Sequence, residues 1–345
     1  MDFIPHSKPT IDAKDIEAVS QVLKSGALVQ GKNVLEFEAK VSRYLGVKEG
    51  VAVNSGTSAL HLALLSLNIG PGDEVMLPSF VCLALLNAVL YTGAKARVVD
   101  VKENDFNISP LEVRHKLNKK VKAIIVPHIF GYPADLKELL GFGVPVIEDC
   151  AQSIGADYQG RRAGSYGVLS ICSFYATKVM TTGEGGMVLS NQTKILDRVR
   201  DLRQYDHASN LKARYNYKMT DFQAALGLSQ LQRLPEFIKR RRQIALLYDR
   251  AFAASDFMTP VKDAYRDPIY YRYVIKIKNK AKFFMEQLIK KGIGASAPVF
   301  KPLHQYLQGS RCPVADRLMD QCVSIPIYPG LTNGQIGQIC NALKS

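Results

Sequence analysis

Seven short runs rich in valine and isoleucine, all between residues 26 and 196, constrain the fold of this chain more than any other feature. Such runs are typical of strands buried on both faces of a sheet. Amphipathic stretches separate them, for example TSALHLALLSL (57–67) and SPLEVRHKLNKK (109–120). The alternation predicts an α/β fold with a largely parallel sheet covered by helices, and a functional site at the carboxyl ends of the strands. The runs are GVAVNSG (50–56), DEVMLPS (73–79), ARVVDV (96–101), KAIIVPH (122–128), VPVIEDC (144–150), VLSICSF (168–174) and GGMVLSN (185–191).

The pattern changes near Ala251, after a long helical stretch. YYRYVIKIK (270–278) alternates like a half-exposed strand, whereas AKFFMEQLIKKG (281–292) and LTNGQIGQICNALKS (331–345) have helical periodicity. These elements predict a smaller C-terminal α+β domain. We therefore expect an N-terminal arm (1–15), a large domain (16–245) and a small domain (246–345).

Composition excludes several classes of protein. The net charge of +14 could suit nucleic acid or a polyanionic substrate, but KRRR (239–242) lies in a helical pattern, and no nucleic-acid-binding motif is present. No apolar run is long enough to cross a bilayer, and the N-terminus does not resemble a signal peptide. The six cysteines form no C-x-x-C pair, which fits neither a disulfide framework nor a zinc site. We expect a cytoplasmic protein with reduced, mostly buried thiols, no bound metal and no membrane or nucleic-acid partner.

The first candidate site is the segment NSGTS (54–58), between a predicted strand and a predicted helix. The unpaired N–H groups of a helix start favour an anion, so Gly56, Thr57 and Ser58 are candidates for holding a phosphate group. The alternative is that the Ser and Thr side chains simply cap the helix.

The second candidate lies in VIEDCAQ (146–152), where an apolar strand ends in two carboxylates. A carboxylate there can hold the ring N–H of pyridoxal phosphate, and we assign this role to Asp149. Gln152 could donate to the phenolate oxygen of the ring, and Ala151 is small enough to lie under it. A metal ligand and a helix cap are the alternatives for Asp149.

The third candidate is Lys178, which follows the run VLSICSF and precedes a turn with three glycines. Glycines let the backbone approach a ligand closely, and a lysine beside a phosphate site can form a Schiff base with an aldehyde. Ser173 would help to bind the phosphate. The alternative is a lysine that extends from a strand end into water.

A phosphate cradle, then an acid at a later strand end, then a lysine about thirty residues on is an order that resembles the fold-type I pyridoxal phosphate enzymes. More narrowly, the chain resembles the DegT/DnrJ/EryC1/StrS family of sugar aminotransferases over nearly its whole length. The matching motifs are LKSGALVQGKNVLEFEAKVSRYLGV (23–47), NSGTSALHLAL (54–64), PHIFGYPADL (127–136), EDCAQSIGA (148–156), SFYATKVMTTGEGG (173–186), YNYKMTDFQAALGLSQLQRL (215–234) and PLHQY (302–306).

This resemblance implies a homodimer with a mixed, mostly parallel seven-stranded sheet in the large domain and active sites at the subunit interface. It implies that Lys178 carries the cofactor, that Asp149 pairs with its ring nitrogen, and that Gln152 meets its phenolate oxygen. Gly56, Thr57 and Ser173 would bind the phosphate together with Asn216 of the partner subunit. His304 would contact the substrate, although a histidine in PLHQY could equally be structural.

Two positions depart from the family pattern. Where many relatives place an aromatic ring against the cofactor, this chain has Cys82. Where relatives often have Asn-Tyr-Arg, this chain has Asn216-Tyr217-Lys218, and lysine cannot make the planar two-pronged contact of arginine. We therefore expect different ring contacts and a different preference for substrate or donor.

The resemblance implies an aminotransferase that moves nitrogen from an amino acid, such as L-glutamate, to a keto group of a nucleotide-linked sugar by ping-pong kinetics. A keto-cyclitol acceptor and a dehydratase reaction are alternatives on the same scaffold, and a regulatory nucleic-acid-binding protein is a remote one. A nicotinamide-dependent oxidoreductase would need G-x-G-x-x-G after the first strand, whereas GFGVPV (141–146) precedes a strand.

Overall fold

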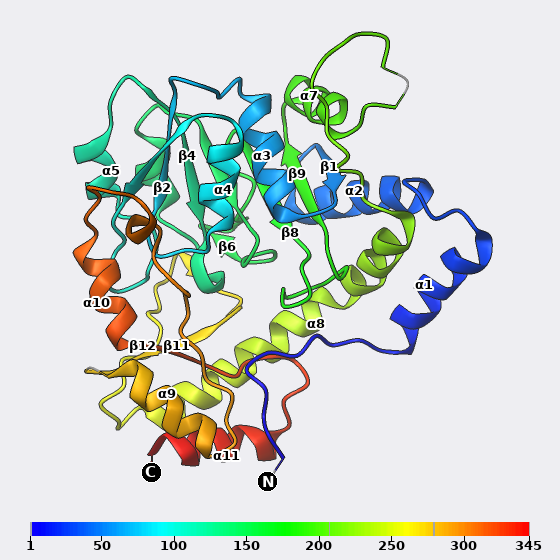
Figure 1. The fold of residues 1–345 in the computed structure, drawn as a ribbon. Helices are drawn as coiled ribbons and strands as arrows, with labels where there is room; N and C mark the ends of the chain where they lie inside the picture. Colours follow the sequence, from blue (N-terminus) through cyan, green and yellow to red (C-terminus); the bar gives the residue numbers. More distant parts are fainter. Residues whose placement is uncertain (1, 207, 279, 345) are drawn as a thin grey trace.

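A seven-stranded sheet forms the centre of the computed structural model, which describes residues 2–206, 208–278 and 280–344 (Figure 1). The strand order is β1-β9-β8-β5-β4-β2-β3. Strands β3, β2, β4, β5 and β8 pair in parallel, whereas β9 is antiparallel to both β8 and β1. Each predicted run overlaps one strand, so the α/β prediction is confirmed. The strands are β1 (Glu49–Val53), β2 (Glu74–Pro78), β3 (Lys95–Val99), β4 (Val121–Pro127), β5 (Val146–Asp149), β8 (Leu169–Ser173) and β9 (Gly186–Ser190).

Helices cover both faces of this sheet. Successive residues of each strand point to opposite faces, and both sets of apolar side chains are buried under helices. Val75 and Leu77 of β2 enter one buried cluster with α3 (Gly56–Ser66), α4 (Ala84–Tyr91) and α7 (Thr193–Arg203). Met76, between them, enters another cluster with α5 (Pro110–Lys116) and α6 (Leu136–Leu140). Farther along the sheet, α2 (Lys32–Leu45) packs on β1 and on the long helix α8 (Asp221–Phe252).

Helix α8 connects the sheet to the C-terminal part of the chain (Figure 1). Its first half contributes Leu228, Leu231 and Leu234 to the cluster under the sheet, and its last turns contribute Tyr248 and Phe252 to a separate core. Helix α1 (Ala13–Ser25) packs along its other side. One continuous helix thus takes part in two hydrophobic cores.

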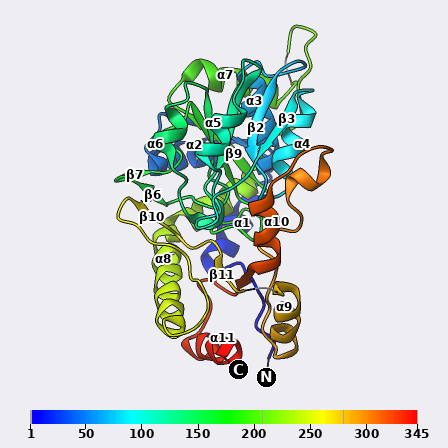
Figure 2. The same cartoon turned by 90° about the vertical axis from the view of Figure 1, so that its left-hand side faces the viewer.

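The second core belongs to a smaller α+β region, seen below the sheet in Figures 1 and 2. Its two-stranded antiparallel sheet pairs β11 (Tyr273–Lys276) with β12 (Cys322–Ile325), and α9 (Ala281–Lys290) and α11 (Asn333–Lys344) contribute to its core. Ile4, near the N-terminus, is buried in the same core. Helix α10 (Pro313–Gln321) lies next to α9 but buries Ala315 and Leu318 in the cluster of the large sheet. The small α+β region is confirmed, and the boundaries at residues 15 and 245 stay predictions.

Three short strands lie outside these two sheets. Strand β6 (Asp157–Tyr158) pairs with both β7 (Arg161–Arg162) and β10 (Arg266–Asp267). The last of these precedes β11, so the pairing ties the C-terminal region to the large sheet. Among the described residues, no helix is both long and apolar enough to cross a membrane.

Candidate active site

A cavity of about 270 Å³ opens at the carboxyl ends of the strands. Strand β5 ends at Asp149 and β8 ends at Ser173, while β1 leads directly into the first turn of α3. The fold therefore brings together three segments that are far apart in the sequence, at the edge where an α/β sheet binds its ligand. The cavity is lined by Ser55, Gly56, Thr57, Leu60, Cys82, Ala84, Leu85, Asp149, Ala151, Ile171, Ser173, Tyr175, Lys178 and Glu184.

The start of α3 combines a helix cap with an open anion site. Ser55 is the N-cap residue, and its Oγ accepts a hydrogen bond of 3.1 Å from the N–H of Ser58. The Ser58 hydroxyl donates to Oδ1 of Asn54 at 2.7 Å, so Ser58 belongs to the cap and does not line the cavity. Gly56 and Thr57 do line it. Helix capping therefore accounts for Ser55 and Ser58, whereas Gly56 and Thr57 remain the candidates for holding a phosphate group.

Gly56 also sets how closely α3 approaches β8. A Cβ atom at this position would lie 2.7 Å from Cβ of Ser173, closer than two carbon atoms can pack. Glycine therefore allows the helix start to lie against the end of the strand. This contact places Ser173 beside the unpaired N–H groups of α3, as a phosphate cradle requires.

Asp149 is buried, with 5% of its surface exposed, and its Oδ1 accepts the N–H of Ala151 at 2.9 Å. Burial raises the pKa of its carboxyl group, while the Ala151 N–H and the positive charge of Lys178 act in the opposite direction. A buried carboxylate with so few donors has capacity for a further cationic partner. The ring N–H of a pyridoxal phosphate is a partner of that kind.

Glu148, the preceding residue, has a different environment. Its carboxylate accepts the N–H groups of Gly164, Tyr166 and Gly167 at 2.6 to 2.7 Å and the Nε2–H of His128 at 3.0 Å. Burial alone would raise its pKa, but these hydrogen bonds and the nearby histidine outweigh burial and lower it. Glu148 is therefore a satisfied structural carboxylate.

Lys178 projects toward Tyr271, whose ring centre lies 5.2 Å from its Nζ. Tyr271 precedes β11, and its hydroxyl lies 3.3 Å from Oγ1 of Thr177, the residue before the lysine. Burial would raise the pKa of Tyr271, but the positive charges of Lys178 and Arg272 and the Thr177 hydrogen bond lower it. Sequence reasoning missed Tyr271, because nothing in YYRYVIKIK indicates contact with a residue almost a hundred positions away.

Cys82 opens into the cavity, as its alignment with the aromatic position of the family suggests. The enclosing protein raises the pKa of its thiol, and Lys178 partly counteracts this effect. The one aromatic side chain in the described lining is that of Tyr175, which is 46% exposed. The other five cysteines are buried, and all six are free thiols.

Gln152 does not line the cavity, but it follows Ala151, which does. A hydrogen bond fixes the orientation of its side-chain amide. Its Oε1 accepts the N–H of Phe130 at 2.7 Å. The amide nitrogen has no hydrogen-bond partner among the described residues and can donate elsewhere. This orientation is the one that donation to a phenolate oxygen requires.

The remaining predicted residues lie outside the cavity lining. The backbone carbonyl of Asn216 accepts a hydrogen bond of 3.3 Å from Nδ2 of Asn54, and its own side chain is exposed. Lys218 forms an ion pair with Asp206. His304 lies in η2 (Leu303–Tyr306), 2.6 Å from Oγ of Ser79, with its other ring nitrogen 3.1 Å from Asp316.

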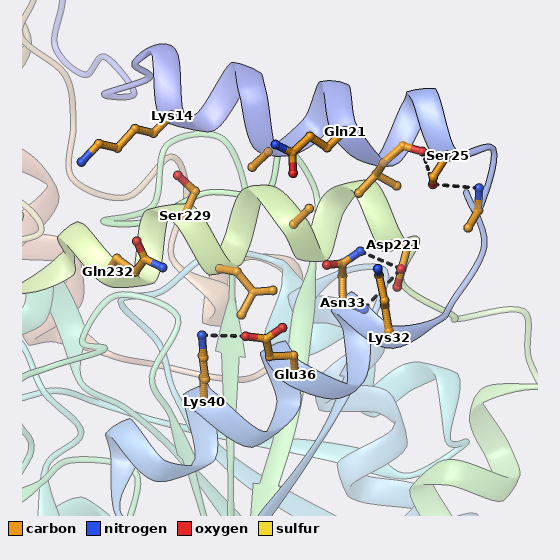
Figure 3. A pocket seen from close by; sticks show the side chains of 15 residues that line it. Lys14, Gln21, Ser25, Lys32, Asn33, Glu36, Lys40, Asp221, Ser229 and Gln232 are labelled. Carbon is orange, nitrogen blue, oxygen red and sulfur yellow. Dashed lines mark hydrogen bonds and ion pairs between the residues drawn. The ribbon is translucent and has the colours of Figure 1, made fainter.

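A second cavity, of about 380 Å³, lies between α1, α2 and α8 and contains none of the predicted residues (Figure 3). Its acidic groups already have partners: Asp221 accepts the N–H groups of Gly31 and Val34, and Glu36 pairs with Lys40 at 2.7 Å. Among the described residues that line it, no carboxylate is therefore without a partner. Within the described residues, no cluster of three or more His, Cys, Asp or Glu side chains could hold a metal ion.

The cavity at Lys178 fits pyridoxal phosphate on the evidence of its own residues. The α3 N-terminus with Ser173 suits the phosphate, the under-partnered Asp149 suits the ring nitrogen, and the amine of Lys178 lines the same space. Lys178 is also close enough to Asp149 that its positive charge opposes the rise in the pKa of that carboxyl group.

Comparisons with known proteins show the family of this chain. The DegT/DnrJ/EryC1/StrS aminotransferase family matches residues 9–344. GDP-perosamine synthase of Escherichia coli O157:H7 is 33% identical over all of this chain and 98% of that protein. Among solved structures, the aminotransferase TlmJ of Streptoalloteichus hindustanus has a TM-score of 0.93 and 30% identity, covering 99% of this chain and 97% of that one.

The sugar aminotransferase Spr1654 of Streptococcus pneumoniae, described as putative and solved in its PLP form, has a TM-score of 0.94 and 25% identity. The match covers 99% of this chain and 98% of that one. These matches in sequence and in fold extend over nearly the full length of the chain. The chain belongs to the DegT/DnrJ/EryC1/StrS family and is a pyridoxal-phosphate-dependent aminotransferase.

Proposed function

We propose that this aminotransferase moves an amino group from an amino acid, L-glutamate in particular, to a keto group of a nucleotide-linked sugar. The observation that carries the proposal is that Lys178, Asp149 and the N-terminus of α3 line one cavity. The acceptor class is supported by a relative named GDP-perosamine synthase that matches the whole chain. The net charge of +14 would also attract a diphosphate substrate, an effect that salt should weaken.

Pyridoxal phosphate, when bound, supplies an electron-withdrawing ring that stabilises the electron pair left on the donor carbon. Asp149 would keep the ring nitrogen protonated, and Gln152 would donate its free amide N–H to the phenolate oxygen. Gly56, Thr57 and Ser173 would hold the phosphate, with Asn216 of the partner subunit.

Lys178 is the proposed acid and base. Its Nζ would attach the cofactor in the resting enzyme and, once released, take the proton from the α-carbon of the donor. In the second half-reaction the same amine would deliver a proton to the carbon that receives the nitrogen. Because the 2-oxo acid would leave before the acceptor binds, with the transferred nitrogen kept on the enzyme, ping-pong kinetics are expected.

We also propose that the enzyme is a homodimer. Helix α1 and the loop after it expose four large apolar side chains, those of Ile16, Leu23, Leu28 and Val29, and the last of them is 76% exposed. Such a group on one side of a molecule favours association. His304 and Lys218 remain proposed substrate contacts, and the cytoplasmic location stays a prediction.

The test is to incubate the purified enzyme with glutamate and a panel of nucleotide-linked 3-keto and 4-keto sugars, and to detect aminated products by mass spectrometry. Keto-inositols form a second arm. Amination of a nucleotide-linked sugar supports the proposal. Amination of keto-inositols alone would move the acceptor to the cyclitols, and loss of water without nitrogen transfer would indicate a dehydratase.

A further inference from the structure

The amine of Lys178 lies against the ring of Tyr271. The ring centre is 5.2 Å from Nζ, a distance at which a positive charge is attracted to the face of an aromatic ring. Among the described residues, Nζ of Lys178 takes part in no ion pair and no hydrogen bond. The ring is therefore the group that the described structure offers to this amine.

The contact is also shielded from water. Tyr271 is 9% exposed. Lys218 and Lys301 likewise lie over tyrosine rings, but those rings, of Tyr205 and Tyr306, are exposed. Water weakens the attraction between a cation and an exposed ring, whereas a desolvated contact is the strong case. The contact between Lys178 and Tyr271 is of the stronger kind.

Both the side chain and the main chain of Tyr271 are held in place. Its hydroxyl lies 3.3 Å from Oγ1 of Thr177. Two residues earlier, the N–H of Ile269 donates to the carbonyl of Gly131 at 3.0 Å. The carbonyl of Tyr271 itself accepts a hydrogen bond of 3.2 Å from Nη1 of Arg241, a buried residue of α8. The ring is thus a fixed surface beside a flexible lysine side chain.

Tyr271 is not part of the described lining of the cavity, whereas Lys178 is. The tyrosine would therefore affect a bound cofactor or substrate through the amine of the lysine. This arrangement suits a residue that positions the lysine, and it does not require the tyrosine to touch the reacting molecules.

We propose that Tyr271 is a positioning residue that holds the free amine of Lys178 in place for bonding to the cofactor and for proton transfer. The inference rests on the proposed function in that it takes Lys178 to be the attachment site and the acid and base. In attachment, the amine nitrogen bonds to the aldehyde carbon, and the aldehyde oxygen leaves as water with two hydrogens of the amine. In proton transfer, the amine becomes positively charged as it takes the proton, and the ring face stabilises that charge.

The first test measures covalent attachment to the cofactor-free enzyme. Stopped-flow absorbance follows formation of the C=N bond after pyridoxal phosphate is mixed with the enzyme. Tyr271→Leu, which removes the ring, should slow attachment about tenfold, because an amine that samples several positions is less often aligned with the aldehyde. Tyr271→Phe keeps the ring and should attach the cofactor within about threefold of the parent rate.

Binding of pyridoxine phosphate, which lacks the aldehyde, separates loss of positioning from damage to the cavity. This compound cannot bond to the amine, so its affinity should be equal in the parent enzyme and in each Tyr271 variant. Thermal unfolding shows whether each variant is folded. If Tyr271→Leu is not, Tyr271→Met, which also lacks a ring but fills irregular space, replaces it in every measurement.

Tyr328→Leu is the matched control. Tyr328 is also buried, but it lies in the second core, with the helices of the C-terminal region. This variant should lose stability and still attach pyridoxal phosphate at the parent rate. The control therefore distinguishes a positioning effect from a general loss of stability.

The second test follows proton transfer in the half-reaction with glutamate. Tyr271→Leu should lower kcat about tenfold and leave KM for glutamate unchanged, because the ring acts on the amine and not on the bound donor. The primary isotope effect with α-deuterated glutamate should rise in this variant, since proton transfer to a poorly held amine then limits the rate. A purely structural role for the tyrosine predicts no such rise.

The outcomes are distinct. Attachment at equal rates in the parent and Tyr271→Leu overturns the positioning role. A loss in Tyr271→Phe as large as that in Tyr271→Leu assigns the effect to the hydroxyl and also overturns it, as does weakened binding of pyridoxine phosphate to Tyr271→Leu. If no sugar accepts nitrogen yet attachment depends on the ring, the positioning role stands and the proposed acceptor fails. If a sugar is aminated and the attachment rates are equal, the proposed function stands and the positioning role fails.

Discussion

Glu148 and Asp149 are consecutive residues at the end of β5, and their side chains have opposite environments. Glu148 accepts four hydrogen bonds in a closed pocket, whereas Asp149 accepts one and faces the cavity at Lys178. The alternation of side chains along a strand produces this division. One carboxylate therefore stabilises the fold, and the other is left for the cofactor.

Asp149→Asn should remove activity without unfolding the enzyme. The amide has the shape of the carboxylate but cannot keep a ring nitrogen protonated, so turnover should fall on the order of 100-fold or more, the scale of one lost preorganised electrostatic contact. Stopped-flow measurement of the half-reaction with glutamate checks the rate, and calorimetric unfolding checks the fold. Turnover within a few-fold of the parent would exclude the assigned role.

Glu148→Gln should instead lower the stability of the fold. Its amide nitrogen would face backbone N–H groups that need an acceptor, which should cost about 1–3 kcal/mol of unfolding free energy. Because the pKa of Glu148 is lowered in the folded state, its contribution is full above its ordinary value of 4.5 and is lost as pH falls through the folded pKa. The stability difference between parent and variant should therefore shrink in acid, and a constant difference from pH 7 to pH 3 would contradict this.

Lys178→Ala should abolish the covalent link to the cofactor. In the parent enzyme, borohydride treatment followed by digestion should place the reduced cofactor on the peptide that contains residue 178. The variant should show no such peptide and no turnover. Lys24→Ala, at the exposed end of α1, should be labelled as the parent is. A label on another lysine would show that the assignment is wrong.

Gly56→Ala should weaken cofactor binding by displacing the start of α3. The added Cβ would lie 2.7 Å from Cβ of Ser173, so the helix or the strand end must move. We expect affinity for pyridoxal phosphate to fall about tenfold, roughly the loss of one charge-assisted hydrogen bond. Gly337→Ala, where nothing lies within 4 Å in α11, should leave affinity unchanged and slightly raise stability. Fluorescence titration of the cofactor measures both.

Cys82 should be the first thiol to react in cofactor-free enzyme, because the other five cysteines are buried. Its pKa is raised, so the rate of modification by a thiol reagent should keep increasing as pH rises past the ordinary thiol range. Bound pyridoxal phosphate should slow the reaction, since Cys82 lines the proposed cofactor cavity. Cys82→Ser should remove the fast phase, and a fast phase that persists would place the reactive thiol elsewhere.

Local sequence determined the strands and the helices between them, because burial on both faces leaves a continuous apolar run that needs no knowledge of distant residues. It also determined the candidates at strand ends, Gly56, Asp149, Ser173 and Lys178, because a parallel sheet brings such ends together. These residues line one cavity in the structure.

Tertiary structure alone decided the contacts between segments distant in the chain. It placed Tyr271 beside Lys178, set His6 against Arg272, and assigned Ser58 to the helix cap in place of the cavity. It also decided which carboxylate of the Glu148-Asp149 pair was satisfied. Hydrogen bonding and burial depend on which segments meet in space, and the pattern of residues along a chain does not contain that information until the packing is known.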